Sequence, residues 1–452
     1  MKVAGVVLAI AILAWTYFSY GYIEDDAFIH LEYARSFSSG LGFAFAGHVS
    51  NGDTSPLWVL IVSFIHLFAG DWIVAAKIAC AAGLVIAASG AWRLASDLPR
   101  ETATHALLPF AAVAVTLINP YFVHWSFSGM EATAALGLSF WAVWAVFANR
   151  PWLAASLIAI GPVLRPELLV FAALLGPLLL WRTRKPALAM VMAIPVAVWF
   201  IYALHSFGTI VPNTNAAKRG GALPEIASRL VQVYLMGFSV TLLLLPFVCA
   251  KGMWHRKTPP VVWALLLWPV ACIAFYLANH TLVQTRYCLL SMPSLTLAVL
   301  WLLGRVSRPQ LFTAATASML IASLAVVVLI VIPHVRNKEE LIDVTSMVST
   351  YVRDHVPAGD PVAVMAIGQV EFESHHALVD LGGITNPEVV RYLNNPVGTL
   401  HWAKGQGARY FVGRQPEPSA ERVFGSVLPY VGWSLQRAKY RDKEEFGVYR
   451  LR

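Results

Sequence analysis

The sequence predicts an all-α protein that crosses a membrane many times and carries a small α/β domain at its C-terminus. Of its 452 residues, 58% are hydrophobic and only 13% are charged, which is far more apolar than a soluble domain. Apolar windows of about 20 residues, the length a helix needs to cross the hydrocarbon core, recur along the first 333 positions. Beyond Pro333 the apolar runs shorten to strand length and charge density rises.

The apolar windows are expected to be helices, because backbone groups in lipid must be hydrogen-bonded internally. There are twelve candidate segments, at 4–22, 56–70, 72–95, 105–120, 131–148, 152–163, 168–181, 187–204, 230–250, 260–278, 286–303 and 311–333. Twelve crossings would return the tail to the side of the N-terminus, in conflict with the charge pattern if Lys2 and the tail lie on opposite sides. The segments 56–70, 152–163 and 168–181 are short enough for half-helices, so we expect eleven or thirteen crossings.

The first segment resembles a secretory signal in length, but we expect an uncleaved helix. Lys2 is its only charged residue, and no small-x-small cleavage site precedes Glu24. The four cysteines lie within or at the ends of apolar segments and are too scattered for a metal site. They are expected to be packing residues: Cys80, Cys249, Cys272 and Cys288.

Basic residues predict the orientation. The short connections 181–185, 251–257 and 305–308 carry Lys and Arg, so the positive-inside rule places them in the cytoplasm. The connections 205–229 and 279–286 and the tail then face the other side. Positions 1–333 hold 19 basic and 11 acidic residues and the tail holds 14 of each, so the net charge of +8 lies in the membrane part. It indicates topology rather than a nucleic-acid-binding surface.

The tail predicts a soluble α/β domain at 334–452, after a membrane domain at 1–333. Its apolar patterns indicate helices at 338–355 and 386–393. Strands are expected at 361–366, 377–381, 408–413, 433–440 and 446–452. No internal repeat is evident.

Candidate chemistry gathers in the first loop, 23–55, which holds five of the eleven acidic residues of the membrane part: Glu24, Asp25, Asp26, Glu32 and Asp53. The acidic pair begins an amphipathic stretch that would lie in the membrane interface, with both carboxylates near the positive end of the helix dipole. The alternative is a solvated N-cap cluster, which would be favoured for an isolated pair. The glycines of the loop and the turn residues 51–56 favour a site.

Here the chain resembles a known family. The patterns DDAFIHLEYA, GLGFAF and NGDTSPLW are similar to the first extracytoplasmic loop of the GT-C superfamily, integral membrane glycosyltransferases that use polyprenyl-phosphate-linked sugars. The most similar branch contains the mycobacterial terminal arabinofuranosyltransferases. Further similar elements are Ser128-Gly-Met-Glu131, Leu164-Arg-Pro-Glu167, Gly208-Thr-Ile-Val-Pro-Asn-Thr214 with Lys218, Arg286-Tyr287, and Asp380-Leu-Gly-Gly-Ile-Thr-Asn386. One departure is Ala46-Gly47-His48, where the family more often carries Asn-x-Gly-Glu, so that acidic position is absent here.

The resemblance implies a GT-C-like fold and the transfer of a sugar from a polyprenyl phosphate to a hydroxyl of an envelope glycan, glycolipid or protein. It assigns the general base to Asp25, with Asp26 orienting it or binding sugar hydroxyls. An aligned Asp can accept the proton late in the transition state, and the neighbouring carboxylate tends to raise one pKa of the pair. Direct displacement with a single base would invert the anomeric centre.

The departing phosphate requires cationic donors, for which Arg165, Lys218, Arg219 and Arg286 are candidates. For Lys218 and Arg219, snorkelling to the lipid headgroups is an equal alternative. Arg165 and Glu167 lie between short apolar runs, where an ion pair costs free energy and usually has a function. The full set of expected substrate-binding residues is His30, Arg35, Asn51, Thr54, Glu131, Arg165, Glu167, Asn213, Lys218, Arg286 and Tyr287. A surface role is an equal alternative for His30 and Arg35, and a helix N-terminal charge is the alternative for Glu131.

No metal site is predicted. His375 and His376 with Glu371 and Glu373 lack a firm ligand spacing. Acidic residues near a phosphate are compatible with a divalent cation but do not require one.

These observations predict an inverting GT-C-type glycosyltransferase of a bacterial inner membrane, with its site and tail on the extracytoplasmic face. The first alternative is a transporter or flippase of a lipid-linked sugar precursor. Transporters tend to show repeats and ionisable residues near the bilayer midplane, whereas here the charges collect on one face. The second is a non-catalytic assembly protein for envelope polysaccharides whose tail is the binding module.

Overall fold

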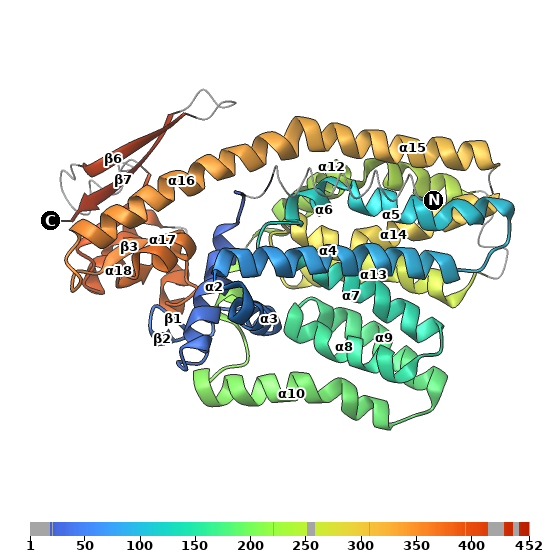
Figure 1. Ribbon diagram of the computed structural model, residues 1–452, viewed down its shortest axis with the longest axis horizontal. Coiled ribbons are helices and arrows are strands. Elements are labelled where there is room, and N and C mark those ends of the chain that lie inside the picture. The colour runs from blue at the N-terminus through green and yellow to red at the C-terminus, as the bar shows by residue number, and fades with distance from the viewer. Residues whose placement is uncertain are drawn as a thin grey trace.

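A computed structural model describes residue 19 and residues 21–219, 221–250, 258–306, 308–393, 395–414, 429–436 and 443–451. It is mostly helical, with a small sheet region near the C-terminus, as the sequence predicts. The long helices lie side by side, and the tail is packed against one end of the bundle (Figure 1).

Six helices in the described part of the chain are long and apolar enough to cross a membrane. They are Trp72–Asp97 (α4), Ala187–Phe207 (α10), Leu223–Val248 within α12 (Leu223–Ala250), Pro260–Ala278 (α13), Thr285–Arg305 within α14 (Thr285–Val306), and Pro309–His355, which joins α15 (Pro309–Val326), the π-helical turn η3 (Val327–Val331) and α16 (Ile332–His355). Shorter apolar helices are α3 (Pro56–Ala69), η1 and α5 (Ala103–Leu117), α7 (Ala132–Phe147), α8 (Pro151–Leu164) and α9 (Leu168–Thr183). Each expected segment from 56–70 onward is therefore a helix. The segment 4–22 lies outside the described residues, and the number of crossings stays a prediction.

Helix α14 lies at the centre of the bundle, and its membrane window is entirely buried. Helices α4 and α7 pack closely because glycines face the contact. A Cβ at Gly137 would lie 2.6 Å from the backbone nitrogen of Ala87, and one at Gly83 would lie 2.9 Å from that of Ala134. Small residues of this kind let helix backbones approach in a membrane protein.

The tail contains a five-stranded sheet in the order β4-β3-β5-β7-β6. Strand β3 is parallel to β4 and β5, and β7 is antiparallel to β5 and β6. The strands are β3 (Val362–Val364), β4 (Leu378–Asp380), β5 (Tyr410–Arg414), β6 (Pro429–Gln436) and β7 (Lys443–Arg450). The parallel pairs require crossovers, which contain α17 (Ile367–Ser374) and then the 3₁₀ helix η4 (Pro387–Tyr392) and α18 (Pro396–Gly405). Helices α17 and α18 were not predicted, and β6 begins four residues before the expected 433–440, of which 437–440 lie outside the described residues.

The first loop forms helix α2 (Asp25–Ser38) and the hairpin of β1 (Ala44–Phe45) and β2 (His48–Val49). The helix was predicted, and its expected position in the membrane interface stays a prediction, but its apolar side chains face protein rather than lipid. Its apolar residues are buried by protein, since Phe28 is 1% exposed and its ring centroid lies 5.5 Å from that of Phe372 in α17. The tail covers α2, so its amphipathic pattern reflects burial against α3 and α17.

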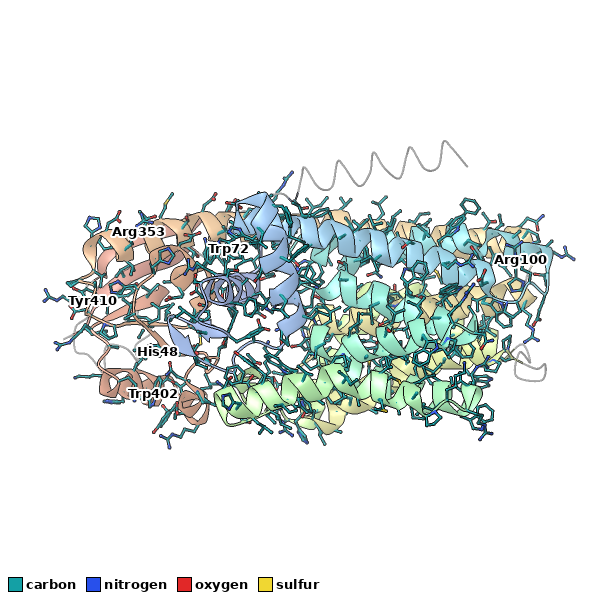
Figure 2. All side chains as sticks on the ribbon, turned by 60° about the horizontal axis from the view of Figure 1, so that its bottom comes forward. His48, Trp72, Arg100, Arg353, Trp402 and Tyr410 are labelled. Carbon is teal, nitrogen blue, oxygen red and sulfur yellow. The ribbon has the colours of Figure 1, made fainter. Side chains whose placement is uncertain are left out.

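Two short helices complete the end of the bundle that faces the tail: α6 (Pro120–Trp125) and α11 (Asn213–Lys218). Figure 2 shows His48, Arg353, Trp402 and Tyr410 at this end and Arg100 at the opposite end. The connections 208–219 and 279–286 also meet at the tail-facing end, where Arg219 and Thr281 form an isolated β-bridge.

Candidate active site

A cavity of about 400 Å³ lies where the helix bundle meets the tail. Ile384 of the tail closes one side of it. The other lining residues come from α2, the first loop, the start of α7, the α8–α9 connection, α10, α11, α13 and α14. Its charged lining residues are Asp26, His30, Asp53, Glu131, Arg165, Glu167, Lys218 and Arg286.

Asp26 is the member of the acidic pair that faces the cavity. Its Oδ2 lies 2.6 Å from Nη2 of Arg286, which donates a hydrogen bond, and 3.8 Å from Nζ of Lys218. Burial opposes ionisation, but the Arg286 and Lys218 cations outweigh it and hold the pKa of Asp26 well below its ordinary value. The carboxylate is therefore ionised and set between two cations that belong to different helices.

Asp25 is not among the residues that line the cavity. Its carboxylate accepts hydrogen bonds from the backbone N–H groups of Gln369, at 3.0 Å, and Gly368, at 3.4 Å, in the first turn of α17. Burial raises the pKa of Asp25 to about 6; the amide of Gln369 opposes this rise and the charge of Asp26 adds to it. A Cβ at Gly368 would lie 2.1 Å from the Asp25 carbonyl oxygen, so only glycine permits this approach. Asp25 thus joins α2 to the tail.

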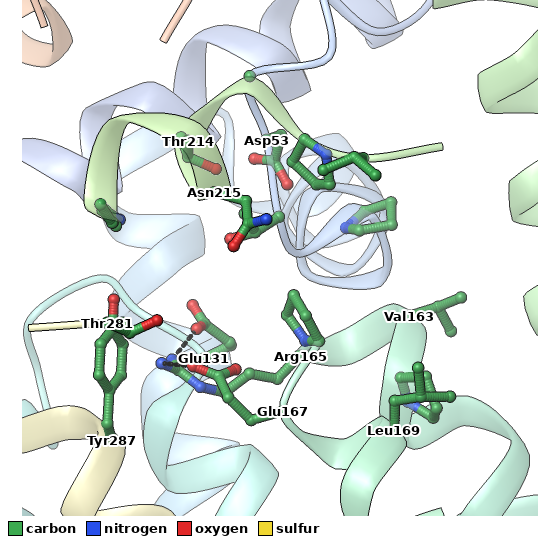
Figure 3. Close-up of a pocket in the computed structure, with 18 of the residues that line it drawn as sticks. Asp53, Glu131, Val163, Arg165, Glu167, Leu169, Thr214, Asn215, Thr281 and Tyr287 are labelled. Atoms are coloured by element: carbon green, nitrogen blue, oxygen red, sulfur yellow. Dashed lines mark hydrogen bonds and ion pairs between the residues drawn. The ribbon is translucent and has the colours of Figure 1, made fainter. Parts of the chain in front are cut away.

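A buried network of alternating charges forms the adjoining wall. His30 Nδ1 lies 2.5 Å from Oδ2 of Asp53, and His30 Nε2 lies 3.5 Å from Oε2 of Glu131. Burial disfavours the imidazolium, but the two carboxylates prevail and raise the pKa of His30 to about 10. Arg165 donates to Glu131 and, at 3.1 Å, to Glu167; Figure 3 shows these ion pairs among the residues that line the cavity. Each carboxylate of the network therefore has a cationic partner.

Arg286 pairs with fewer carboxylates than Arg165, although the Nε of each arginine is buried with no hydrogen-bond partner among the described residues. In the part of the chain that the structure describes, Arg165 pairs with two carboxylates and Arg286 with one, Asp26. The Nε of Arg286 is buried and has no hydrogen-bond partner among the described residues. Its guanidinium carbon lies 5.5 Å from the ring centroids of both Trp125 and Tyr287, which restrict its position. Arg286 is therefore held in place and can accept a further anion.

The other side of the cavity is apolar. Val163, Leu169 and Val170 come from the α8–α9 region, and Val196 and Phe200 come from α10. In Figure 3, Val163 and Leu169 lie across the cavity from Thr281 and Tyr287. The cavity thus has a charged end and a hydrophobic end, as an amphiphile with an anionic head group requires.

Most of the residues expected to bind substrate line the cavity: His30, Thr54, Glu131, Arg165, Glu167, Lys218, Arg286 and Tyr287. Three others do not line it and instead make contacts between segments. Asn51 donates to the carbonyls of Thr209, at 3.0 Å, and Val211, at 3.2 Å. Asn213 donates to the carbonyl of Ile384 at 3.0 Å, and Arg35 to that of Phe372 at 2.9 Å. These three side chains connect the first loop, the 208–218 segment and the tail.

Arg219, the remaining phosphate candidate, is exposed and donates to the carbonyl of Asn279 at 3.2 Å. Several lining residues were not among the substrate-binding residues expected from the sequence: Asp53, Thr214, Asn215, Asn279, Thr281 and Ile384. Asp53 could have been found, since it belongs to the acidic set of the first loop. The others are neutral residues of connecting segments, which no charge pattern distinguishes.

Comparison with known proteins supports the fold and leaves the activity open. A family model described as a domain of unknown function, DUF8728, matches residues 334–449. No curated protein matches the chain. The crystal structure of ArnT from Cupriavidus metallidurans bound to undecaprenyl phosphate is similar over 99% of this chain and 98% of that one, with a TM-score of 0.64 and 12% identity. The apo structure of that ArnT gives a TM-score of 0.65 with the same identity and coverage. The chain therefore has the same overall fold as this ArnT.

Proposed function

We propose that this protein is a membrane glycosyltransferase that moves a sugar from a polyprenyl phosphate to a hydroxyl group of an acceptor. The observation that carries the proposal is the cavity, in which the Asp26 carboxylate lies between Arg286 and Lys218 and faces a space with a hydrophobic far side. The likeness in fold to ArnT, which was crystallised with undecaprenyl phosphate, supports a lipid-linked donor.

In this proposal the donor phosphate binds Arg286 and Lys218. Arg286 is buried and its Nε has no hydrogen-bond partner among the described residues, and Nζ of Lys218 lies 3.8 Å from the Asp26 carboxylate, so both have donors for phosphate oxygens. Val163, Leu169 and Phe200 would contact the first isoprenoid units. Arg165 instead supports the wall, because Glu131 and Glu167 already occupy its guanidinium.

The geometry favours Asp26 over Asp25 as the general base. Asp26 faces the cavity, whereas the Asp25 carboxylate is hydrogen-bonded to α17. Paired with Arg286, Asp26 is a weak base, but a bound phosphate would share both cations and so raise its affinity for a proton. Donor binding would thereby prepare the base. Asp25 becomes a positioning residue that holds the start of α2 against the tail.

The reaction then follows a single displacement. The acceptor oxygen attacks the anomeric carbon as the bond from that carbon to the phosphate oxygen breaks. The acceptor proton passes to Asp26, and the polyprenyl phosphate leaves as an anion held by Arg286 and Lys218. Attack from the face opposite the phosphate inverts the anomeric centre, and proton transfer to an aligned carboxylate contributes about 10²–10⁴ in rate.

The finer assignments rest on the sequence. The acceptor would be an envelope glycan, glycolipid or protein on the extracytoplasmic face of a bacterial inner membrane, and arabinofuranosyl transfer is suggested by motif resemblance alone. A divalent cation is not needed to balance the phosphate, since Arg286 and Lys218 carry charge for it; Asp53 and Glu131 are engaged with His30 and Arg165.

The purified protein in proteoliposomes tests the proposal against the transporter alternative. Undecaprenyl-phosphate-linked sugars, including the arabinofuranosyl donor, would be supplied with an envelope glycan extract as acceptor. Sugar transfer with release of undecaprenyl phosphate is expected. Movement of the intact donor between leaflets, with no release of undecaprenyl phosphate, would favour a flippase and overturn the proposal.

A further inference from the structure

A second group of polar side chains lies outside the cavity, where the first loop, α6 and the start of α16 meet. Glu24, His124 and His334 each offer one ligand atom, and the three atoms lie within 4.8 Å of one another. His124 is buried, Glu24 is partly buried and His334 is exposed, and none of them lines the cavity. We propose that this cluster binds a zinc ion. The inference does not depend on the proposed sugar transfer.

The surroundings of Glu24 leave a coordination position on one side. Its Oε2 pairs with Lys338 Nζ at 3.1 Å, and its Oε1 accepts a hydrogen bond from the Tyr22 hydroxyl at 2.8 Å. The same Oε1 lies 3.8 Å from Nε2 of His124. The Tyr22 hydroxyl also lies 2.9 Å from Nε2 of His124, so it bridges the two atoms, and a metal bound between them would displace this hydroxyl.

The two imidazole rings also favour a metal. The ring centroids of His124 and His334 lie 5.1 Å apart at an interplanar angle of 34°. Two imidazoles this close would repel each other if both were protonated, whereas neutral imidazoles bind a metal through their ring nitrogens. The orientation of the His124 ring is restricted by its packing on Trp125, with ring centroids 4.7 Å apart.

The donor set selects zinc over the common hard cations. Zinc accepts imidazole nitrogen and carboxylate oxygen at about 2.0–2.2 Å in tetrahedral geometry, which places donor atoms about 3.4 Å apart. The present 3.8 Å between His124 and Glu24 needs only a small closure. Calcium takes about six to eight oxygen ligands and magnesium a near-ideal octahedron, and this cluster supplies a single carboxylate. Water would occupy the fourth position.

The position of the cluster suggests a structural role. Glu24 directly precedes the acidic pair, and His334 lies in the first turn of α16, the helix that leads into the tail. His124 comes from α6, whose next residue, Trp125, contacts Arg286. A zinc ion here would therefore fix the start of α2 relative to both the bundle and the tail.

Zinc binding by the purified full-length protein tests the inference. After treatment with a chelator, the protein would be titrated with zinc chloride, and bound zinc would be measured after gel filtration. The wild type should retain about one zinc ion per chain. His334→Ala should lose this ion, with an affinity for zinc at least about 10-fold weaker than that of the wild type. His401→Ala, which removes an exposed histidine of α18, is the matched control and should bind as the wild type does. Equal binding by the wild type and His334→Ala, or no retained zinc, would overturn the inference.

A substitution of Lys338 distinguishes a metal site from a network of ion pairs. Its ammonium competes with a cation for Glu24, so Lys338→Gln should bind zinc several-fold more tightly than the wild type. Zinc should also raise the Tm of the wild type and of Lys338→Gln, but not that of His334→Ala. If Glu24 only forms ion pairs with its neighbours, zinc will leave all three Tm values unchanged, and the inference fails.

Discussion

At the scale of single residues, the account depends on which member of the acidic pair faces the cavity. The two are adjacent at the start of α2, and successive residues of a helix point about 100° apart. Asp26 therefore faces Arg286 while Asp25 faces the first turn of α17. Sequence spacing could not distinguish them, because the partner of Asp25 lies more than 340 positions away in the chain. Only the tertiary contact assigns the roles.

Arg286 is expected to dominate binding of the lipid phosphate. A hydrogen bond to a charged group contributes about 1.5–3 kcal/mol, so Arg286→Gln should weaken binding of undecaprenyl phosphate by at least about 10-fold. The matched control is Arg219→Gln, since Arg219 is an exposed arginine nearby that does not line the cavity. Binding can be followed by the ligand-induced shift in Tm of the detergent-purified protein. Equal weakening in both variants would show that the effect is a general loss of positive charge.

At the scale of elements, the central contact is between α2 and α17. Gly368 lies in this contact, and a Cβ there would overlap the Asp25 carbonyl. Overpacking typically costs about 1–3 kcal/mol, so Gly368→Ala should lower the Tm and reduce sugar transfer. Gly405→Ala is the control, because nothing lies within 4 Å of a Cβ at that position in α18. If Gly368→Ala matches the wild type in both measurements, α17 is not fixed against α2 in solution.

The same contact should depend on pH. Burial raises the pKa of Glu371, in α17, to about 8, with the charge of Glu32 adding to the rise and Arg35 opposing it. Burial likewise raises the pKa of Glu32, in α2, to about 7. A raised carboxyl pKa means that the folded protein holds its proton more tightly than the unfolded chain does. This stabilising contribution is therefore complete below the ordinary value of 4.5 and is lost as the pH rises toward about 8.

A comparison of Tm at pH 5.5 and pH 8 would measure this effect. The wild type should lose more stability over that interval than Glu371→Gln, whose amide does not titrate. Glu388→Gln, at an exposed carboxylate of the same domain, should behave as the wild type does. A pH dependence that is the same in all three proteins would remove Glu371 from the explanation.

The elements differ in how far the sequence determines them. The apolar segments from 56–70 onward were predicted because each is continuously hydrophobic, and the longer ones meet the length that a bilayer requires. Helices α17 and α18 were missed because they are short, with 8 and 10 residues, although Asn395 and Pro396 at the start of α18 are a helix N-terminal signal. The burial of α2 could not be predicted either, since amphipathic helices at an interface and those under a domain have the same pattern.

At the scale of the whole molecule, the proposal requires the tail, the β1–β2 hairpin and the cavity to share the extracytoplasmic side. His48 and Arg100, both exposed, lie at opposite ends of the molecule (Figure 2). His48→Cys should react with a membrane-impermeant maleimide in intact spheroplasts, whereas Arg100→Cys should react only after permeabilisation. Both variants would be made in a background in which the four native cysteines are replaced by serine, so that only the introduced thiol can react. The reverse pattern would place the site on the cytoplasmic face.

The predicted membrane domain and tail domain both contribute residues to the cavity. Ile384 of the tail lines the cavity, and its carbonyl accepts a hydrogen bond from Asn213. The predicted cavity residues come from segments far apart in the sequence, and the charges that stood out beside apolar segments were Arg165 with Glu167, and Glu131. The neutral residues that complete the walls depend on how the tail docks, which local patterns do not encode.

The measurement that most directly tests the central claim is sugar transfer by purified Asp26→Asn and Asp25→Asn proteins, each with a polyprenyl-phosphate sugar and the acceptor extract. We predict that Asp26→Asn lowers kcat by about 10²–10⁴, while undecaprenyl phosphate binds at least as tightly, because Arg286 loses a competing carboxylate. Asp25→Asn should retain part of its activity and lower the Tm, as expected for a residue that docks the tail. Full activity of Asp26→Asn, with activity abolished only in a stably folded Asp25→Asn, would contradict the account.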